Sequence, residues 1–425
     1  MITLYDNEIE LSKILNREIQ SYGEYEGIVK EIIDRVINEG DAAVLDYSRR
    51  FDCPTLASLR VTEEEIDAAI ARLDPDFLET LRQARENITL FHEQQLRDGF
   101  RLEKEGGIVL GQRYTPIEKV GIYVPGGTAA YPSTVLMNAI PAQIAGVKQI
   151  IMTTPADKNG NIRDEILAAA RMCGVTAIFK CGGAQAIAAL AYGTETVPAV
   201  HKIVGPGNIF VALAKRAVFG KVAIDMIAGP SEILVLADGT ANPRHVAADL
   251  LSQAEHDKLA TAVLVTDSRD LALAVQAELE VQIPLLSRAE IARHSIDTNG
   301  KIILVESMER AVEISNEIAP EHLEVCVEDP FRYLDSITNA GSIFLGGYSP
   351  EPMGDYFAGP NHTLPTGGSA KFSSPLSVDD FRKKSSYLYY TKEALGKARD
   401  RVADFASREG LGAHARSITI RFEED

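Results

Sequence analysis

The chain has 425 residues, of which 45% are hydrophobic and 24% charged, a composition typical of a globular protein with more than one domain. Its formal net charge of −18 argues against nucleic acid or an anionic membrane as a partner, and no apolar run approaches the roughly 20 residues of a membrane-spanning helix. The four cysteines show no C-x-x-C pairing and the first residues lack the layout of a signal peptide, so we expect a reduced, cytoplasmic setting.

The first hundred residues are expected to be mainly helical. One apolar stripe at helical spacing is followed by Gly40, which suits a helix C-terminus; its members are Val29, Ile32, Ile33, Val36 and Ile37. Thr62-Glu-Glu-Glu65 matches a capping box, and a longer helix with an apolar side is expected after Pro75. We interpret these residues as structural.

From Gly107 onward, short apolar runs alternate with helical patterns, which predicts a parallel α/β sheet. The expected strands are 120–124, 149–153, 177–179, 202–204 and 232–237. The expected helices are 135–144 (despite Pro141), 166–173, 184–191 and 209–219. Turns rich in Gly and Pro follow the strands, where such sheets tend to bind ligands: Pro125-Gly-Gly127, Cys181-Gly-Gly183, Gly205-Pro-Gly-Asn208 and Ala228-Gly-Pro-Ser231.

The turn at Gly205-x-Gly207 follows a strand and precedes a helix, as a dinucleotide-binding fingerprint would. Phe210 occupies the position of the third glycine, however, so the G-x-G-x-x-G pattern fails. On this pattern alone, a plain connection between strand and helix remains the alternative to a cofactor site.

The stretch Asn242–His256 is predicted to be a helix that carries metal ligands. Asn242 is a good N-cap and Pro243 suits the first helical position. Gln253 and His256 are spaced i, i+3 and therefore lie on one face of the helix. A histidine near a helix end is more often structural, so the interpretation depends on the segments that follow.

Beyond this helix the α/β alternation resumes, and we infer a second α/β sheet. Strands are expected at 259–265, 301–305, 323–327 and 342–345, and helices at 271–279 and 310–318. The segment from Ser369 to Tyr390 is predicted to be irregular, followed by a helix from about Lys392 to Arg408 and a strand-like Ser417–Phe422. A tail so separate from any sheet is a candidate for packing on a partner chain.

Three titratable residues in or beside the expected strand 323–327 are candidates for a catalytic role. Glu321 and His322 are adjacent at its start and form a plausible acid/base pair, with an exposed loop pair as the alternative. Cys326 could act as a thiolate nucleophile in aldehyde oxidation. A buried structural cysteine is the preferred interpretation.

Two later segments offer further metal ligands. The Gly- and Pro-rich stretch Gly354–Gly368 must form a shaped loop, and it contains Asp355 and His362. Glu409 and His414 lie just past the expected C-terminal helix. An N/O shell suited to zinc would result if four residues from distant segments converged, which spacing alone does not show: Gln253, His256, Asp355 and His414.

Six motifs, in order along the chain, together resemble the histidinol dehydrogenase family, and the resemblance runs from about Val36 to His414. They are Tyr123-Val-Pro-Gly-Gly127, Gly205-Pro-Gly-Asn208, Ala228-Gly-Pro-Ser-Glu232, Leu251-Ser-Gln-Ala-Glu-His256, Pro320-Glu-His-Leu-Glu324 and Gly354–Thr366. The resemblance implies NAD-dependent oxidation of L-histidinol to L-histidine through L-histidinal, the last step of histidine biosynthesis.

The resemblance also implies roles for individual residues. It makes Glu321 and His322 the catalytic acid/base pair. One zinc ion per subunit would be held by Gln253, His256, Asp355 and His414. The implied substrate contacts are these four ligands together with Ser231, His322, His362 and Glu409. The implied NAD contacts are Tyr123, Gln185 and Asn208.

The implied architecture is two doubly wound, Rossmann-like parallel-sheet domains in a homodimer. We expect residues 1–20 to form a helical segment and residues 21–119 and 238–372 to form the first α/β domain. Residues 120–237 would form the second, cofactor-side domain. Residues 373–425 would be a dimerisation tail that completes the active site of the partner.

Two rival functions remain from the residues alone. A zinc-dependent amidohydrolase, with Glu321 activating water, predicts no dependence on NAD and leaves the Gly-rich strand-end turns unexplained. A metal- or nucleotide-binding scaffold without catalysis predicts that Glu321 and His322 can be changed without loss of function. The family resemblance favours the dehydrogenase over both.

Overall fold

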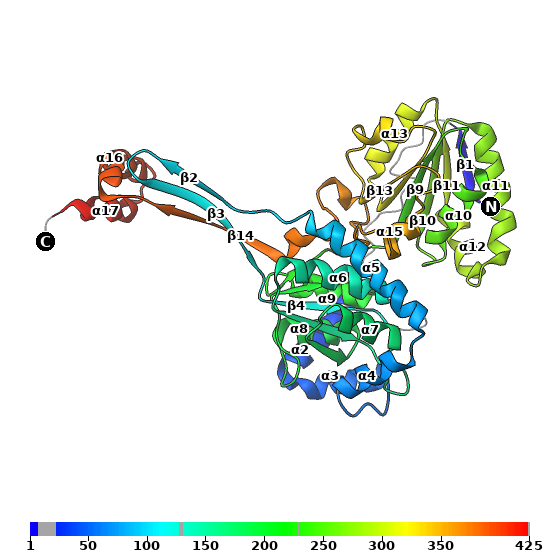
Figure 1. Ribbon diagram of the computed structural model, residues 1–425, viewed down its shortest axis with the longest axis horizontal. Coiled ribbons are helices and arrows are strands. Elements are labelled where there is room, and N and C mark those ends of the chain that lie inside the picture. Colours follow the sequence, from blue (N-terminus) through cyan, green and yellow to red (C-terminus); the bar gives the residue numbers. More distant parts are fainter. Residues whose placement is uncertain (7–22, 127–130, 228, 424–425) are drawn as a thin grey trace. The chain divides into compact units, whose positions relative to one another are not determined.

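The computed structural model describes residues 1–6, 23–126, 131–227 and 229–423 (Figure 1). They form two compact units, one of Met1–Gln95 with Ile117–Phe381 and one of Leu96–Pro116 with Arg382–Asp425. Most of the expected helical segment 1–20 lies outside the described residues, as do Gly127 and Ala228 of the expected turns. Within the described ranges, no helix is both long and apolar enough to cross a membrane.

A five-stranded parallel sheet contains most of the expected elements between residues 119 and 224. Its strands lie in the order β6-β5-β4-β7-β8, so the direction of winding reverses between β4 and β7. The strands are β4 (Lys119–Tyr123), β5 (Gln149–Thr154), β6 (Ala177–Lys180), β7 (Lys202–Val204) and β8 (Ala223–Ile224). The connecting helices are α6 (Pro132–Ala145), α7 (Asp164–Met172), α8 (Gly183–Tyr192) and α9 (Ile209–Val218).

Four N-terminal helices share one hydrophobic core with this sheet. They are α2 (Gly23–Glu39), α3 (Asp41–Phe51), α4 (Glu63–Arg72) and α5 (Pro75–Glu93). The predicted stripe of α2 is buried except for Ile37, and both hydrogen bonds of the capping box between Thr62 and Glu65 form. The expectation that residues 21–119 belong with 238–372 is wrong for these helices, because their apolar faces pack into the core of the five-stranded sheet.

A second parallel sheet has six strands in the order β1-β11-β10-β9-β12-β13. The strands are β1 (Thr3–Asp6), β9 (Glu232–Ala237), β10 (Thr261–Thr266), β11 (Lys301–Leu304), β12 (His322–Cys326) and β13 (Ser342–Leu345). Alternate residues of β9 enter two different cores. Ile233 and Val235 pack with α10 (Pro243–Ala254), α11 (Arg269–Gln282) and α12 (Ala289–Thr298), whereas Leu234 and Leu236 pack with α13 (Met308–Ile318).

Two expectations are corrected by this sheet. Residues Thr3–Asp6 form an edge strand that pairs with β11, where a helix was expected, because the open edge of β11 supplies backbone partners that the local sequence does not reveal. Strand β9 pairs with β10 and β12 and thus belongs here, not to the domain expected to end at residue 237. Helix α12 was not anticipated.

The second unit is built on an antiparallel sheet of order β14-β3-β2. Its elements are β2 (Phe100–Lys104), β3 (Ile108–Pro116), β14 (Arg382–Tyr389), α16 (Lys392–Arg408) and α17 (Gly412–Thr419). The tail is therefore not irregular up to Tyr390, because β14 pairs with β3 over eight residues. Ser417–Phe422 is helical, ending in a 3₁₀ turn (Ile420–Phe422), so the expected strand there is wrong. The unit also includes 96–116 and begins its C-terminal part at 382, not 373.

Short helices occupy several connections. They are α14 (Phe331–Leu334), α15 (Glu351–Tyr356) and 3₁₀ turns at Ile283–Leu285, Ser369–Lys371 and Val378–Phe381. Of these, α15 carries Asp355, one of the expected metal ligands.

Candidate active site

Helix α10 has the N-terminus that its sequence predicts. The Asn242 side chain accepts a hydrogen bond from the backbone N–H of Arg244, and Pro243 occupies the first turn. The helix ends at Ala254, which places Gln253 in its last turn and His256 just beyond. Gln253 is 1% exposed, and its Oε1 has no hydrogen-bond partner among the described residues. A buried amide oxygen without a partner is costly, which marks it as a candidate ligand atom.

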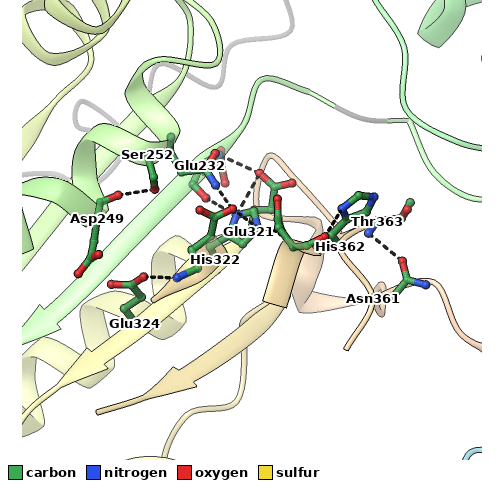
Figure 2. Close-up of polar contacts among 12 residues, drawn as sticks. Glu232, Asp249, Ser252, Glu321, His322, Glu324, Asn361, His362 and Thr363 are labelled. Atoms are coloured by element: carbon green, nitrogen blue, oxygen red, sulfur yellow. Dashed lines mark hydrogen bonds and ion pairs between the residues drawn. The ribbon is translucent and has the colours of Figure 1, made fainter. Parts of the chain in front are cut away.

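Glu321 and His322 lie at the amino end of β12, beside the amino end of β9 (Figure 2). The carboxylate of Glu321 accepts a hydrogen bond from the backbone N–H of Glu232 (2.9 Å), and His322 Nδ1 lies 3.1 Å from the carbonyl oxygen of the same residue. A carbonyl can only accept, so Nδ1 carries a proton and donates. The carbonyl of Glu232 therefore fixes the orientation of the imidazole, and His322 Nε2 is the nitrogen left to exchange protons with a substrate.

Carboxylates surround the free nitrogen of His322. Nε2 lies 3.5 Å from Asp355 and 3.9 Å from Glu351, and these three residues offer atoms within 4.8 Å of one another that could hold a cation. The side-chain amide of Gln253 also lies at this ring, with its nitrogen 3.3 Å from His322 Nδ1, so the end of α10 adjoins the same cluster. The structure thus brings together Gln253, His322 and Asp355 from three segments.

Burial and charge shift the titration of this cluster strongly. Burial raises the pKa of Glu321 to about 7, into the range useful for acid/base work at neutral pH. Burial acts to lower the pKa of His322, but the carboxylates of Glu321 and Asp355 outweigh it and raise the value to about 10. Burial would likewise raise the pKa of Asp355, yet its hydrogen bond with His322 prevails and lowers it to about 2. These opposite shifts favour an ion pair between His322 and Asp355, whose Nε2 and carboxylate oxygen lie 3.5 Å apart.

The loop after α15 adds His362. Its Nδ1 donates to the backbone carbonyl of Asp355 (3.1 Å), and its Nε2 is buried without a hydrogen-bond partner in the described part of the chain. Desolvation lowers the pKa of both His362 and His256, against the opposing charge of Asp355. Both imidazoles are therefore neutral at pH 7 and able to act as ligands or acceptors.

Two further carboxyl groups, those of Glu324 and Asp249, lie next to this cluster. Glu324, two residues along β12 from His322, accepts a hydrogen bond from the backbone N–H of Glu351 (2.7 Å) and so holds the first residue of α15 (Figure 2). Burial and the neighbouring Asp249 raise its pKa to about 9, and burial raises that of Asp249 as well. Burial also raises the pKa of the Cys326 thiol, which lies close to both carboxyls.

The residues expected to contact a cofactor lie along the carboxyl edge of the five-stranded sheet. Tyr123 ends β4, Gln185 lies in the first turn of α8, and Asn208 caps α9 just after β7. The Tyr123 hydroxyl accepts a hydrogen bond from the backbone N–H of Gly183 (3.1 Å), which ties β4 to the start of α8. The edge where β4 and β7 adjoin is the place where winding reverses, which in open α/β sheets favours ligand binding.

A family model described as histidinol dehydrogenase matches residues 15–422 of this chain. Histidinol dehydrogenases of Clostridium acetobutylicum and Listeria monocytogenes are 56% and 55% identical over 418 and 419 residues, which is 98% and 99% of this chain and 97% of each relative. The crystal structure of histidinol dehydrogenase from Elizabethkingia anophelis superposes with a TM-score of 0.94 at 40% identity, covering 99% of this chain and 98% of that one. The chain belongs to the histidinol dehydrogenase family.

Membership of the histidinol dehydrogenase family confirms the resemblance inferred from the motifs and makes the protein an oxidoreductase of histidine biosynthesis. Glu409 and His414 lie in the second unit, at the C-terminus of α16 and within α17, and both are exposed in this chain. Ser231 directly precedes β9 and the backbone that holds Glu321 and His322.

Sequence reasoning missed three residues of the candidate site. Glu232 starts a strand that is otherwise wholly apolar, an unusual place for a charge. Glu351 follows Pro350 at a helix start and is spaced i, i+4 from Asp355, which puts both on one face of α15. Asn361, next to His362, carried no local signal; only its tertiary contacts reveal it.

Proposed function

We propose that the protein catalyses NAD-dependent oxidation of L-histidinol to L-histidine through L-histidinal. The observation that carries the proposal is the buried cluster of Gln253, Glu321, His322 and Asp355 at the amino ends of β9 and β12, in a chain of this family. It combines candidate ligands, a base with one free nitrogen and a carboxyl with a pKa of about 7.

The donor set fits one zinc ion per subunit. Gln253 Oε1 is buried without a partner, His256 is held neutral, and Asp355 keeps its negative charge, so these residues supply oxygen and nitrogen ligands in the form that zinc requires. His414 of a second copy would be the fourth ligand. When bound, zinc would act as a Lewis acid and as a template for the nitrogens of the substrate.

His322 serves as the base in both half-reactions. Its Nδ1–H is fixed on the carbonyl of Glu232, so Nε2 takes the proton of the substrate alcohol as hydride leaves for the first NAD. A base must be neutral, whereas the carboxylates of Glu321 and Asp355 raise the pKa of His322 in the chain alone. With Asp355 engaged as a metal ligand, part of that negative charge would be neutralised, which would favour the neutral imidazole.

Glu321 serves the second half-reaction. A carboxyl with a pKa of about 7 is half ionised at neutral pH and can activate water for addition to the retained aldehyde. After releasing its first proton to solvent, His322 deprotonates the resulting diol as the second hydride leaves. Ser231, His362 and Glu409 orient the substrate, and NAD accepts each hydride beside Tyr123, Gln185 and Asn208, at the reversal point of a doubly wound sheet.

We also propose a homodimer in which the second unit of one chain completes the site of the other. Support comes from the chemistry of Glu409 and His414, a carboxylate exposed at the end of α16 and an imidazole exposed in the first turn of α17. An exposed pair of this kind is available to a site on another copy.

The test is NADH absorbance on mixing L-histidinol, NAD and purified protein, with and without prior chelation. About two NADH per histidinol, lost on chelation and restored by zinc, are expected. A yield of one NADH per histidinol would show that the aldehyde is not retained for the second oxidation. No NADH, with hydrolysis of an amide instead, would favour the zinc-dependent amidohydrolase.

A further inference from the structure

Helix α6 contains a proline at an interior position, Pro141. Proline has no backbone N–H, so the carbonyl of Met137, four residues earlier, loses its helical hydrogen-bond donor. Met137 is completely buried, and water cannot replace the missing donor. A buried carbonyl left in this state needs a partner from elsewhere in the chain.

Asn361 supplies that partner from a distant loop. Its Nδ2 donates to the Met137 carbonyl (2.6 Å) and lies 3.3 Å from His92 Nε2, while its Oδ1 accepts a hydrogen bond from the backbone N–H of Thr363 (2.9 Å). The side chain is 4% exposed. All of its polar groups are thus engaged, and no other residue type of this size offers the same two donors and one acceptor.

His92 of α5 is set to accept from Asn361. Its Nδ1 lies 2.8 Å from the carbonyl of Ile88, which can only accept, so Nδ1 carries the ring proton and Nε2 is the acceptor. Burial lowers the pKa of His92, which keeps the ring neutral. The network therefore joins α5 and α6 to the loop through Asn361.

The same loop carries a residue of the active site. His362 adjoins Asn361, and Figure 2 shows Asn361 and His362 turned to opposite sides of the chain. His362 Nδ1 bonds to the carbonyl of Asp355, and its Nε2 has no partner in the described ranges. Fixing the backbone at 361–363 therefore fixes where the imidazole of His362 can reach.

We propose that Asn361 is a positioning residue for His362, anchored on the carbonyl that Pro141 leaves free in α6. Helix α6 follows β4, the strand that ends in Tyr123, so the network couples the loop of the substrate-contacting histidine to the sheet expected to hold the cofactor. Hydride transfer is sensitive to displacements of about 1 Å, which can cost roughly a hundredfold in rate. This inference rests on the proposed contact between His362 and substrate.

The first test compares Asn361→Asp, which keeps the shape but loses both donors, with a matched control, Asn316→Ala. Asn316 of α13 likewise anchors a loop, through bonds to Ser336, Thr338 and Asn339. Calorimetry of L-histidine binding to the zinc-loaded protein should show affinity reduced at least about tenfold by Asn361→Asp and unchanged by the control. Zinc affinity, measured by competition with a chelator, should stay within about threefold for both.

The second test asks whether Asn361 positions His362 or only donates a hydrogen bond to the buried carbonyl of Met137. Asn361→Ala leaves Met137 without a donor and should lower the melting temperature. Adding Pro141→Ala returns a backbone N–H to that carbonyl, so the melting temperature should recover while the affinity for L-histidine stays low.

Recovery of ligand affinity together with stability in the double variant would overturn the proposal, since Asn361 would then only satisfy Met137. Unchanged affinity in Asn361→Asp would overturn it as well. Failure of the proposed function is distinguishable, because the unaltered zinc-loaded protein would then bind no L-histidine.

Discussion

At the scale of single residues, the site depends on buried groups whose protonation is set by their neighbours. Glu321 and His322 share the backbone of Glu232 as an anchor, and the carboxylates of Glu321 and Asp355 raise the pKa of His322. The residue types and their order along the chain pointed to this chemistry. Their shifted pKa values arise from burial and from contacts between distant segments, which only the folded chain creates.

Cys326→Ser should retain oxidation of both histidinol and histidinal. The Cys326 thiol is buried and its pKa is raised by burial and by Glu324, so it is not a thiolate at neutral pH. NADH formation from each substrate checks this. The comparison variant is His322→Asn, in which the rates of both half-reactions should fall by about a hundredfold or more. Selective loss of histidinal oxidation in Cys326→Ser would instead identify a thiolate mechanism.

Glu324→Gln should make the protein more stable than the parent at alkaline pH. Burial raises the pKa of Glu324 to about 9, above its value in the unfolded chain, so stability is lost as pH rises toward 9 and the carboxyl gives up its proton. The groups facing it are Asp249 on α10, Cys326 on β12 and the N–H of Glu351 on α15.

The side-chain amide that replaces the carboxyl in this variant has no proton to lose. Because the pKa of Glu324 rises from 4.5 to about 9 on folding, the gain in unfolding free energy of the variant should be small at pH 4 and should grow up to pH 9, by at most about 1.4 kcal/mol for each pH unit. Denaturant unfolding at the two pH values provides the measurement. Parallel pH profiles for parent and variant would show that Glu324 does not titrate in this range.

At the scale of elements, helix ends and strand ends carry the function. The last turn of α10, the amino ends of β9 and β12, and short α15 bring the metal and acid/base candidates together. Hydrophobic periodicity and capping residues predicted α10 and most strands, with bounds correct to within a few residues. The strand pairings that align these ends were not predictable, because parallel register is decided by contacts between residues far apart in sequence.

Asp225→Asn should disturb the turn expected to bind NAD. Asp225 forms a buried ion pair with Lys215 of α9 and accepts a hydrogen bond from the N–H of Gly205 (2.7 Å), whose carbonyl accepts from Lys215 (3.0 Å). Gly205 has φ +115° and leaves no room for a Cβ beside the carbonyl of Tyr123, so the turn has little freedom.

Losing one member of a buried pair costs about 3–5 kcal/mol. We therefore expect Asp225→Asn to destabilise the protein by this amount and to weaken NAD binding, measured by calorimetry. Arg72→Ala, which breaks an exposed pair with Asp164, is the control and should cost less than about 1 kcal/mol without affecting NAD. Equal effects of the two variants would contradict this role for Asp225.

At the scale of the whole molecule, the second unit is the least predictable part. Its sheet joins residues 100–116 to 382–389, and local patterns suggested strands in neither segment. It contains Glu409 and His414, so the proposed homodimer assigns part of each active site to it.

Mixing two inactive variants tests that arrangement. A subunit with His322→Asn and one with His414→Asn should regain activity when refolded together, since one of the two sites in a mixed dimer combines an intact core with an intact tail. Random pairing predicts recovery of about a quarter of the parent activity. No recovery, with mixed dimers verified by mass spectrometry, would contradict a site completed by the partner.

The sequence by itself determined the family, the parallel α/β class, the helix that carries Gln253 and the candidate residues of the site. These follow from period, capping and motif order, which are local properties. Tertiary structure alone decided that α2–α5 belong with the five-stranded sheet, that β1 and β9 join the six-stranded one, and that Asn361 bonds to the carbonyl left free by Pro141. Each of these depends on which distant surface buries a given face or satisfies a given backbone group, and no local pattern encodes that choice.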